Sequence, residues 1–187
     1  MYTLEEVQNY VYNCKKCKLH KSRTNIVFGQ GNTNADIMFI GEGPGFYEDQ
    51  KGEAFIGPAG QLLTKAINAI DMTREDVYFG NIVKCRPPKN RDPQSDEIAA
   101  CMLYLRWQVK LIKPKIIVCL GRIAATNIID SNLRITRDRG KWCHRKNTWI
   151  ISTFHPSAVL RDELKKRPFW EDFKEIKNKY ESLISEK

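Results

Sequence analysis

Short apolar segments alternate with helix-like stretches along this chain, and that alternation limits the fold more than any other feature. Each segment is rich in β-branched or aromatic residues and is bounded by turn residues, as buried parallel strands are. We expect strands over residues 35–41, 76–83, 115–121 and 148–154. Strands and helices in alternation imply right-handed crossovers and a parallel sheet with helices on both faces.

Helices are expected between and after these strands, over residues 60–70, 93–112, 121–130 and 168–185. The last has apolar residues spaced by three and four, which predicts one buried face. In parallel sheets, ligands bind outside the carboxyl ends of the strands. Chemically useful residues follow all four strand ends, in the motifs GEGPG, NIVKCRPP, GR and FHPSAVLR. We therefore expect the functional site at that end of the sheet.

The segment GEGPGFYEDQKGEAFIGPAG, residues 41–60, is long for a connection. Most loops in compact domains have about 4–6 residues. A long loop that follows a buried strand typically handles a ligand, because backbone and polar groups there can reach it. We interpret the acidic residues Glu48, Asp49 and Glu53 within it as a solvated loop surface.

Composition places the chain among globular proteins, with 42% hydrophobic and 28% charged residues over 187 positions. We expect one domain spanning residues 1–187. No apolar run approaches the roughly 20 residues of a membrane helix, and the acidic N-terminus has no signal-peptide core, which indicates a cytoplasmic protein. The net charge of +9 is compatible with nucleic acid binding or with a basic surface that serves solubility.

Six cysteines without a secretion signal indicate metal ligands or buried thiols rather than disulfides. Cys14 and Cys17 form a C-x2-C pair, and fifteen residues separate Cys85 from Cys101. Four thiolates can hold zinc or an iron–sulfur cluster. A zinc ribbon favours two tight pairs, so the wide second pair favours a cluster held between structural elements.

These cysteines, together with GEGPG, AFIGPAG, NIVKCRPP and HPSAVLR, resemble the family 4 uracil-DNA glycosylases, from about residue 3 to residue 180. The resemblance implies a three-layer α/β/α sandwich around a central four-stranded parallel sheet. It implies a [4Fe–4S] cluster in which the N-terminal segment supplies two of the four ligands, Cys14, Cys17, Cys85 and Cys101. The implied enzyme flips uracil out of DNA, hydrolyses its N-glycosidic bond and leaves an abasic site for base excision repair.

The resemblance also implies roles for residues near the strand ends. Phe55 would stack on the flipped uracil. Asn81 would read the base, accepting from the ring N–H and donating to the adjacent carbonyl. Gly41 and Gly43 would let the backbone approach the base without a Cβ in the way. His155 would donate to a base carbonyl and stabilise the departing uracil anion.

Two further assignments follow from the resemblance. The motif after His155 resembles a loop that pinches the DNA backbone in the minor groove, and its DNA-binding candidates are Pro156, Ser157, Ala158, Leu160 and Arg161. Leu160 or Arg161 would fill or brace the vacated stack.

Glu42 is the second catalytic candidate, because a carboxylate beside the sugar could orient the attacking water. The superfamily's best-known members have an aspartate where this chain has Gly43. The backbone carbonyls of Glu42 and Gly43 are therefore an alternative holder of the water.

Other readings use fewer of these residues. A non-catalytic DNA-binding module would need the cysteines and the charge but not Phe55, Asn81 and His155 together. A nucleotide-binding enzyme would need a G-x-G-x-x-G fingerprint, which GEGPG lacks. Sister enzymes that accept hypoxanthine or trap their product through a histidine insertion are nearer alternatives. We expect a monomer that acts on uracil-containing DNA.

Overall fold

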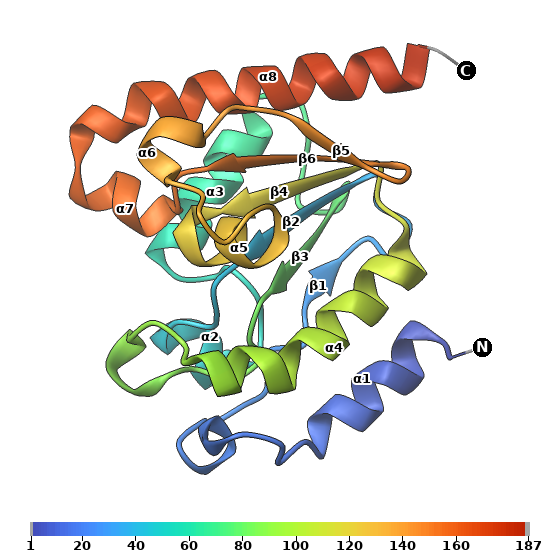
Figure 1. Ribbon diagram of the computed structural model, residues 1–187, viewed down its shortest axis with the longest axis vertical. Coiled ribbons are helices and arrows are strands. Elements are labelled where there is room, and N and C mark those ends of the chain that lie inside the picture. The colour runs from blue at the N-terminus through green and yellow to red at the C-terminus, as the bar shows by residue number, and fades with distance from the viewer. Residues whose placement is uncertain (1, 186–187) are drawn as a thin grey trace.

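The four expected strands lie side by side at the centre of one sheet in the computed structural model, which describes residues 2–185 (Figure 1). Neighbours in the order β3-β2-β4-β6 all pair in parallel. Every residue of β2, β3 and β4 is buried, which explains their continuous apolar runs. The bounds are β2 (Ile37–Gly41), β3 (Val77–Asn81), β4 (Ile116–Leu120) and β6 (Thr148–Thr153).

The expectation of a four-stranded parallel sheet is confirmed only in part, because the sheet has six strands and is mixed. β1 (Gln30–Gly31) pairs antiparallel with β3, and β5 (Cys143–Arg145) pairs antiparallel with β6. Both are short and mostly exposed, so they lack the apolar pattern by which the central strands could be found. They occupy the two edges of the sheet, where short strands limit unwanted pairing with other chains.

Helices cover both faces of the sheet (Figure 1). On one face, Met38, Ile40 and Cys119 belong to a core completed by α1 (Leu4–Tyr12), α4 (Ser95–Ile112) and α5 (Gly121–Ile128). On the other face, alternate residues such as Phe39 and Val118 belong to a core completed by α3 (Pro58–Asn68), α7 (Pro156–Arg161) and α8 (Lys166–Ser185). Within the described residues, no helix is both long and apolar enough to cross a membrane.

Short elements near the strand ends escaped prediction. α2 (Phe46–Lys51) lies between Gly45 and Gly52, and the latter has left-handed backbone dihedrals that end the helix. α7 begins at Pro156 and is capped by the side chain of His155. The remaining elements are α6 (Ile135–Asp138) and three 3-10 helices, Lys18–Lys21, Pro88–Asn90 and Glu163–Lys165.

Candidate active site and four-cysteine site

A cleft of about 540 Å³ lies at the carboxyl ends of the parallel strands, where the sequence indicates a site. Its volume is in the range of small-ligand pockets. The loops after β2, β3 and β6 all contribute to its wall, as do α2 and α7. Among the candidates from the sequence, the lining residues are Glu42, Gly43, Phe55, Asn81, His155, Ser157, Ala158, Leu160 and Arg161.

Asn81 ends β3 and is only 3% exposed, yet its Oδ1 has no hydrogen-bond partner within the described part of the chain. A buried acceptor without a partner costs about 1–3 kcal/mol. Gly41, its neighbour at the end of β2, leaves room beside it. A Cβ on Gly41 would lie 2.6 Å from Asn81 Oδ1 and 2.6 Å from the ring of Phe55. Because Gly41 has no side chain, the space between Asn81 Oδ1 and the Phe55 ring stays open.

Phe55 forms the apolar side of this space. Its ring centroid lies 5.7 Å from that of Phe79 and 6.4 Å from that of His155. Its φ angle is 53°, in the left-handed region that residues other than glycine rarely adopt. Such backbone strain costs about 1–3 kcal/mol and persists only where the surroundings hold it.

Two charged side chains hold the backbone on either side of Phe55. Arg74 donates to the carbonyl of Ala54 at 2.7 Å and to that of Phe55 at 3.1 Å. The Glu48 carboxylate accepts from the backbone N–H groups of Ile56, at 3.0 Å, and Gly57, at 2.8 Å. The strained conformation is therefore fixed from both directions by groups outside it.

The interpretation of Glu48, Asp49 and Glu53 as a solvated surface is wrong for the first two, which are buried. The Asp49 carboxylate accepts from the backbone N–H groups of Thr24 and Asn25. For Glu48 the sequence did contain a signal, because a glycine-rich loop leaves backbone N–H groups, here those of Ile56 and Gly57, that a buried carboxylate can satisfy. Glu53 is exposed, as expected.

His155 has a defined tautomer. The backbone N–H of Ser157 donates to His155 Nδ1 at 3.2 Å, and the Ser157 hydroxyl lies 2.8 Å from the same nitrogen. Nδ1 is therefore an acceptor, and the proton of the neutral ring lies on Nε2. Burial, and secondarily the charge of Arg161, lowers the pKa of His155 to about 4. The imidazole is thus neutral at pH 7 and can donate from Nε2.

Gly121, which begins α5, lets the histidine approach the end of β4. Its φ angle of +85° is left-handed, and a Cβ there would lie 2.7 Å from the Cβ of His155. The GR motif after the third strand therefore serves the site through its glycine.

Glu42 has a pKa raised to about 7. Burial is the main cause, the charge of Asp92 raises the pKa further, and the charge of Arg122 opposes the rise. Asp92 and Arg122 also form an ion pair. The carbonyl of Glu42 already accepts from the backbone N–H of Val83 at 3.1 Å. The carboxyl group is therefore able to exchange a proton near neutral pH.

Apolar side chains stand on two rims of the cleft. Leu160, on α7, is 50% exposed, and Phe46 and Tyr47, on α2, are 50% and 55% exposed. Pro156 is buried at the first position of α7, so it supports the rim without lining the cleft. Exposed apolar residues beside a cleft indicate contact with a partner. Leu160 lies in a motif that indicates DNA contact, whereas no sequence motif indicates such a role for Phe46 and Tyr47.

A second, smaller hollow is lined by Cys14, Cys17, Cys85 and Cys101, which are all free thiols. Three of the sulfur atoms accept hydrogen bonds: Cys85 from Arg23 at 3.2 Å, Cys14 from the Tyr104 hydroxyl at 3.1 Å, and Cys101 from the backbone N–H of Lys84 at 3.2 Å. Donors aimed at sulfur are typical of sites that stabilise thiolate ligands. Among residues 2–185, however, no three His, Cys, Asp or Glu side chains gather around a point that fits one metal ion.

The family model of the uracil DNA glycosylase superfamily matches residues 28–175. The chain belongs to the uracil DNA glycosylase superfamily. It is 44% identical over 185 residues to the type-4 uracil-DNA glycosylase of Archaeoglobus fulgidus, covering 94% of this chain and 92% of that protein. It is 46% identical over 187 residues to the type-4 enzyme of Sulfurisphaera tokodaii, covering 95% of this chain and 84% of that protein. The resemblance inferred from the motifs is confirmed.

A more distant superfamily member, the type-5 uracil-DNA glycosylase of Pyrobaculum aerophilum, is 28% identical over 146 residues, covering 69% of this chain and 64% of that protein. The superfamily match begins at residue 28, so Cys14 and Cys17 lie before it. The cleft residues and the second cysteine pair lie within it.

We predict that Arg74→Met weakens both the fold and the cleft. Two buried carbonyls, those of Ala54 and Phe55, would lose their donor, at a cost of about 1–3 kcal/mol each. Thermal unfolding should shift to lower temperature, and uracil excision at a temperature where the variant is folded should fall by about tenfold or more. Arg106→Met, on the exposed face of α4, is the matched control. Equal excision by the two variants would contradict the assigned role of Arg74.

Proposed function

We propose that this chain is a uracil-DNA glycosylase that binds flipped-out uracil between Phe55, Asn81 and His155 and hydrolyses its N-glycosidic bond. The observation that carries the proposal is the buried, unpaired Oδ1 of Asn81, which lines the cleft beside an aromatic ring. A ligand N–H at that point would satisfy the acceptor. Membership of the superfamily and similarity to the type-4 uracil-DNA glycosylases support the same activity.

Base selection follows from the amide of Asn81. Its oxygen would accept from the ring N–H of uracil, and its NH₂ group would donate to the adjacent carbonyl. Cytosine has an acceptor where uracil has this N–H and a donor where uracil has this carbonyl. Bound cytosine would leave two buried groups unpaired, at about 1–3 kcal/mol each. The glycine at position 41 leaves the base room to reach the amide.

Bond cleavage places negative charge on the departing uracil and positive charge on the sugar. His155 is neutral and carries its proton on Nε2, so it would donate a hydrogen bond to a uracil carbonyl and stabilise the developing anion. With a pKa of about 4, the His155 ring is almost never doubly protonated at neutral pH, so it has no acidic proton to transfer to the base. Its role is therefore electrostatic stabilisation rather than proton transfer.

The attacking water would be oriented by the carboxylate of Glu42. A pKa of about 7 makes this group an effective proton acceptor near neutral pH. The alternative is a water held by the backbone carbonyls of Glu42 and Gly43. The carbonyl of Glu42 already accepts from the backbone N–H of Val83, which leaves it one free lone pair for a water. The negative carboxylate would also stabilise the positive charge that develops on the sugar.

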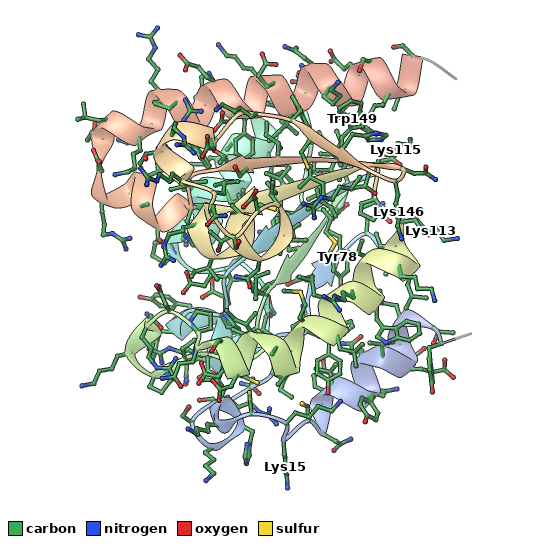
Figure 2. The ribbon with its side chains drawn as sticks, viewed as in Figure 1. Lys15, Tyr78, Lys113, Lys115, Lys146 and Trp149 are labelled. Carbon is green, nitrogen blue, oxygen red and sulfur yellow. The ribbon has the colours of Figure 1, made fainter. Side chains whose placement is uncertain are left out.

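DNA would be held across the rims of the cleft. Leu160, with Arg161 beside it, would enter the stack that uracil has left, and Phe46 with Tyr47 would contact the strand from the opposite rim. Lys15, beside the cysteine site, points away from the molecule (Figure 2) and would add to a basic, DNA-facing surface. We expect the protein to act as a monomer and as one domain; its cytoplasmic location stays a prediction.

A [4Fe–4S] cluster is the ligand that best suits the four cysteines. A single zinc ion would need its thiolates about 2.3 Å away, whereas a cubane cluster binds four thiolates around a larger body. The hydrogen bonds to three of the sulfur atoms suit such a cluster. When bound, it would link α4, the loop after β3 and the N-terminal segment covalently through the four thiolates. Hydrolysis itself requires no electron transfer.

The activity is tested with a labelled oligonucleotide that contains one uracil, followed by alkaline cleavage at abasic sites. Cleavage should occur at uracil and not at cytosine in a matched strand. Matched strands with thymine and hypoxanthine, which present the same ring N–H and carbonyl as uracil, measure the selection that the amide alone does not supply. Asn81→Ala should lose excision by about a hundredfold while it retains affinity for undamaged DNA. Asn68→Ala, an exposed position at the end of α3, is the control. Full excision by the Asn81 variant would refute the base-reading role.

The pH dependence of excision tests Glu42. Since the carboxylate is the active form, the rate should rise with pH through about 7, the pKa of this group. Asp92→Asn removes a charge that raises the pKa, so the rise should move to lower pH. Glu175→Gln, on the exposed face of α8, should leave the profile unchanged. A profile that stays in place in Asp92→Asn would exclude this electrostatic coupling.

The cofactor is tested by iron and zinc analysis of the purified protein. We expect a brown protein with about four irons per chain, and Cys85→Ser should lose most of the colour. A colourless protein that contains one zinc ion per chain would show that the four cysteines bind zinc and not a cluster.

A further inference from the structure

Lys84 lies between the candidate active site and the cysteine site and is only 1% exposed. Lysine is rarely buried to this extent unless a partner compensates its charge. Its Nζ donates to the backbone carbonyl of Asn81 at 2.9 Å and to Oε1 of Gln108 at 2.6 Å. Both of these partners are neutral oxygens. The Phe28 ring, whose centroid lies 5.9 Å from Nζ, offers a weak cation–π contact, and neither it nor the two acceptors carries a negative charge.

Negative charge on Cys101 and Cys85, in the cysteine site, acts on the Lys84 ammonium and favours its charged form. Lys84 lines the same hollow as the four cysteines and directly precedes Cys85. Its backbone N–H donates to Cys101 Sγ at 3.2 Å. A cubane cluster with a 2+ core and four thiolates would carry a charge of about −2. The buried ammonium is then the counter-charge of the cluster on the side that faces Asn81.

The Gln108 side chain that accepts from the Lys84 ammonium is itself fixed by a buried network. Gln108, on α4, is 0% exposed, and its Nε2 donates to the carbonyl of Phe28 at 2.8 Å and to the Tyr78 hydroxyl at 3.1 Å. Tyr78 is on β3, between the sheet and α4 (Figure 2). The loop before β1, through Phe28, and β3, through Tyr78, thus both hold the side chain that positions the lysine.

We propose that Lys84 is a positioning residue that couples the cysteine site to base reading. β3 ends at Asn81, and the Lys84 ammonium supplies a hydrogen bond to the carbonyl of that residue. A fixed carbonyl holds the backbone of Asn81 in place, and the Asn81 side-chain amide extends from this backbone into the cleft. The inference rests on the proposed roles of Asn81 and of the cluster. It explains how a cluster with no chemical step can still affect excision.

The test combines Lys84→Met, which keeps the length of the side chain but removes the charge, with Asn81→Ala. Lys84→Met alone should lower the single-turnover rate on uracil by about tenfold or more, with DNA affinity within about twofold of the parent. In the Asn81→Ala background, the same change should cost no more than about twofold. A lysine that acts through Asn81 has nothing left to position once the amide is gone.

The second readout is the reduction potential of the cluster, which a purely structural role would not move. Loss of a buried positive charge beside the cluster should make the potential more negative, because the reduced cluster carries more negative charge. Lys84→Gln, which keeps an amide donor but no charge, should show the same shift in potential and a smaller loss of rate. Lys110→Met, on the exposed face of α4, should change neither readout.

The outcomes separate this inference from the proposed function. Additive effects of Lys84→Met and Asn81→Ala, or an unchanged potential in both Lys84 variants, would overturn the inference and leave the glycosylase assignment intact. Unimpaired excision by Asn81→Ala alone would overturn the base-reading role and the inference together. If Lys84→Met does not fold, the Lys84→Gln comparisons decide between the same outcomes.

Discussion

The parallel pairing of β2 with β3 ends with Gly41 opposite Asn81, and the candidate active site depends on that register. It places the residue without a side chain beside the residue whose amide needs room. It also places Glu42, the next residue after β2, in the lining of the same cleft. A shift of one residue would turn Asn81 to the other face of the sheet, because side chains alternate along a strand. The buried apolar residues on both faces of β2 and β3 oppose such a shift.

The cleft contains two titratable groups whose surroundings move their pKa values apart. Burial near Arg161 keeps His155 neutral, with a pKa of about 4, whereas burial near Asp92 raises the pKa of Glu42 to about 7. One group is thereby fixed as a hydrogen-bond donor at the base, and the other becomes a proton acceptor near neutral pH. Environments that separate two groups in this way are a common basis for dividing catalytic roles.

The central strands were predictable because each is a short apolar run, buried throughout in β2, β3 and β4 and over the last four residues of β6. The structure places all four within two residues of the predicted bounds. The gathering of Glu42, Asn81 and His155 followed from the rule that parallel strands end at the same edge of a sheet. Edge strands such as Gln30–Gly31 were not predictable, since two exposed polar residues carry no strand pattern. α2 was not predicted because it is a short helix flanked by glycines, a pattern that indicates a loop.

The supporting groups of the site were harder to find than the groups that line it. Arg74 holds a loop about twenty residues earlier in the chain, and only the folded structure brings its guanidinium to those carbonyls. Glu48 is close in sequence to the backbone that it holds, but its charge suggested a solvent-facing role. Local sequence patterns identify which residues follow a strand, whereas they do not identify which distant side chain stabilises a strained backbone.

The cysteine site also affects the order in which the chain is assembled. Two of its thiols lie before the sheet in the sequence, and the last lies in α4, after β2 and β3. During synthesis, the first pair leaves the ribosome before its partners exist and must wait until α4 has been made. Joining such distant segments also carries an entropic cost of loop closure that contacts between neighbouring residues avoid. The segment that carries Cys14 and Cys17 therefore stays unattached to the cysteine site until the middle of the chain has been made.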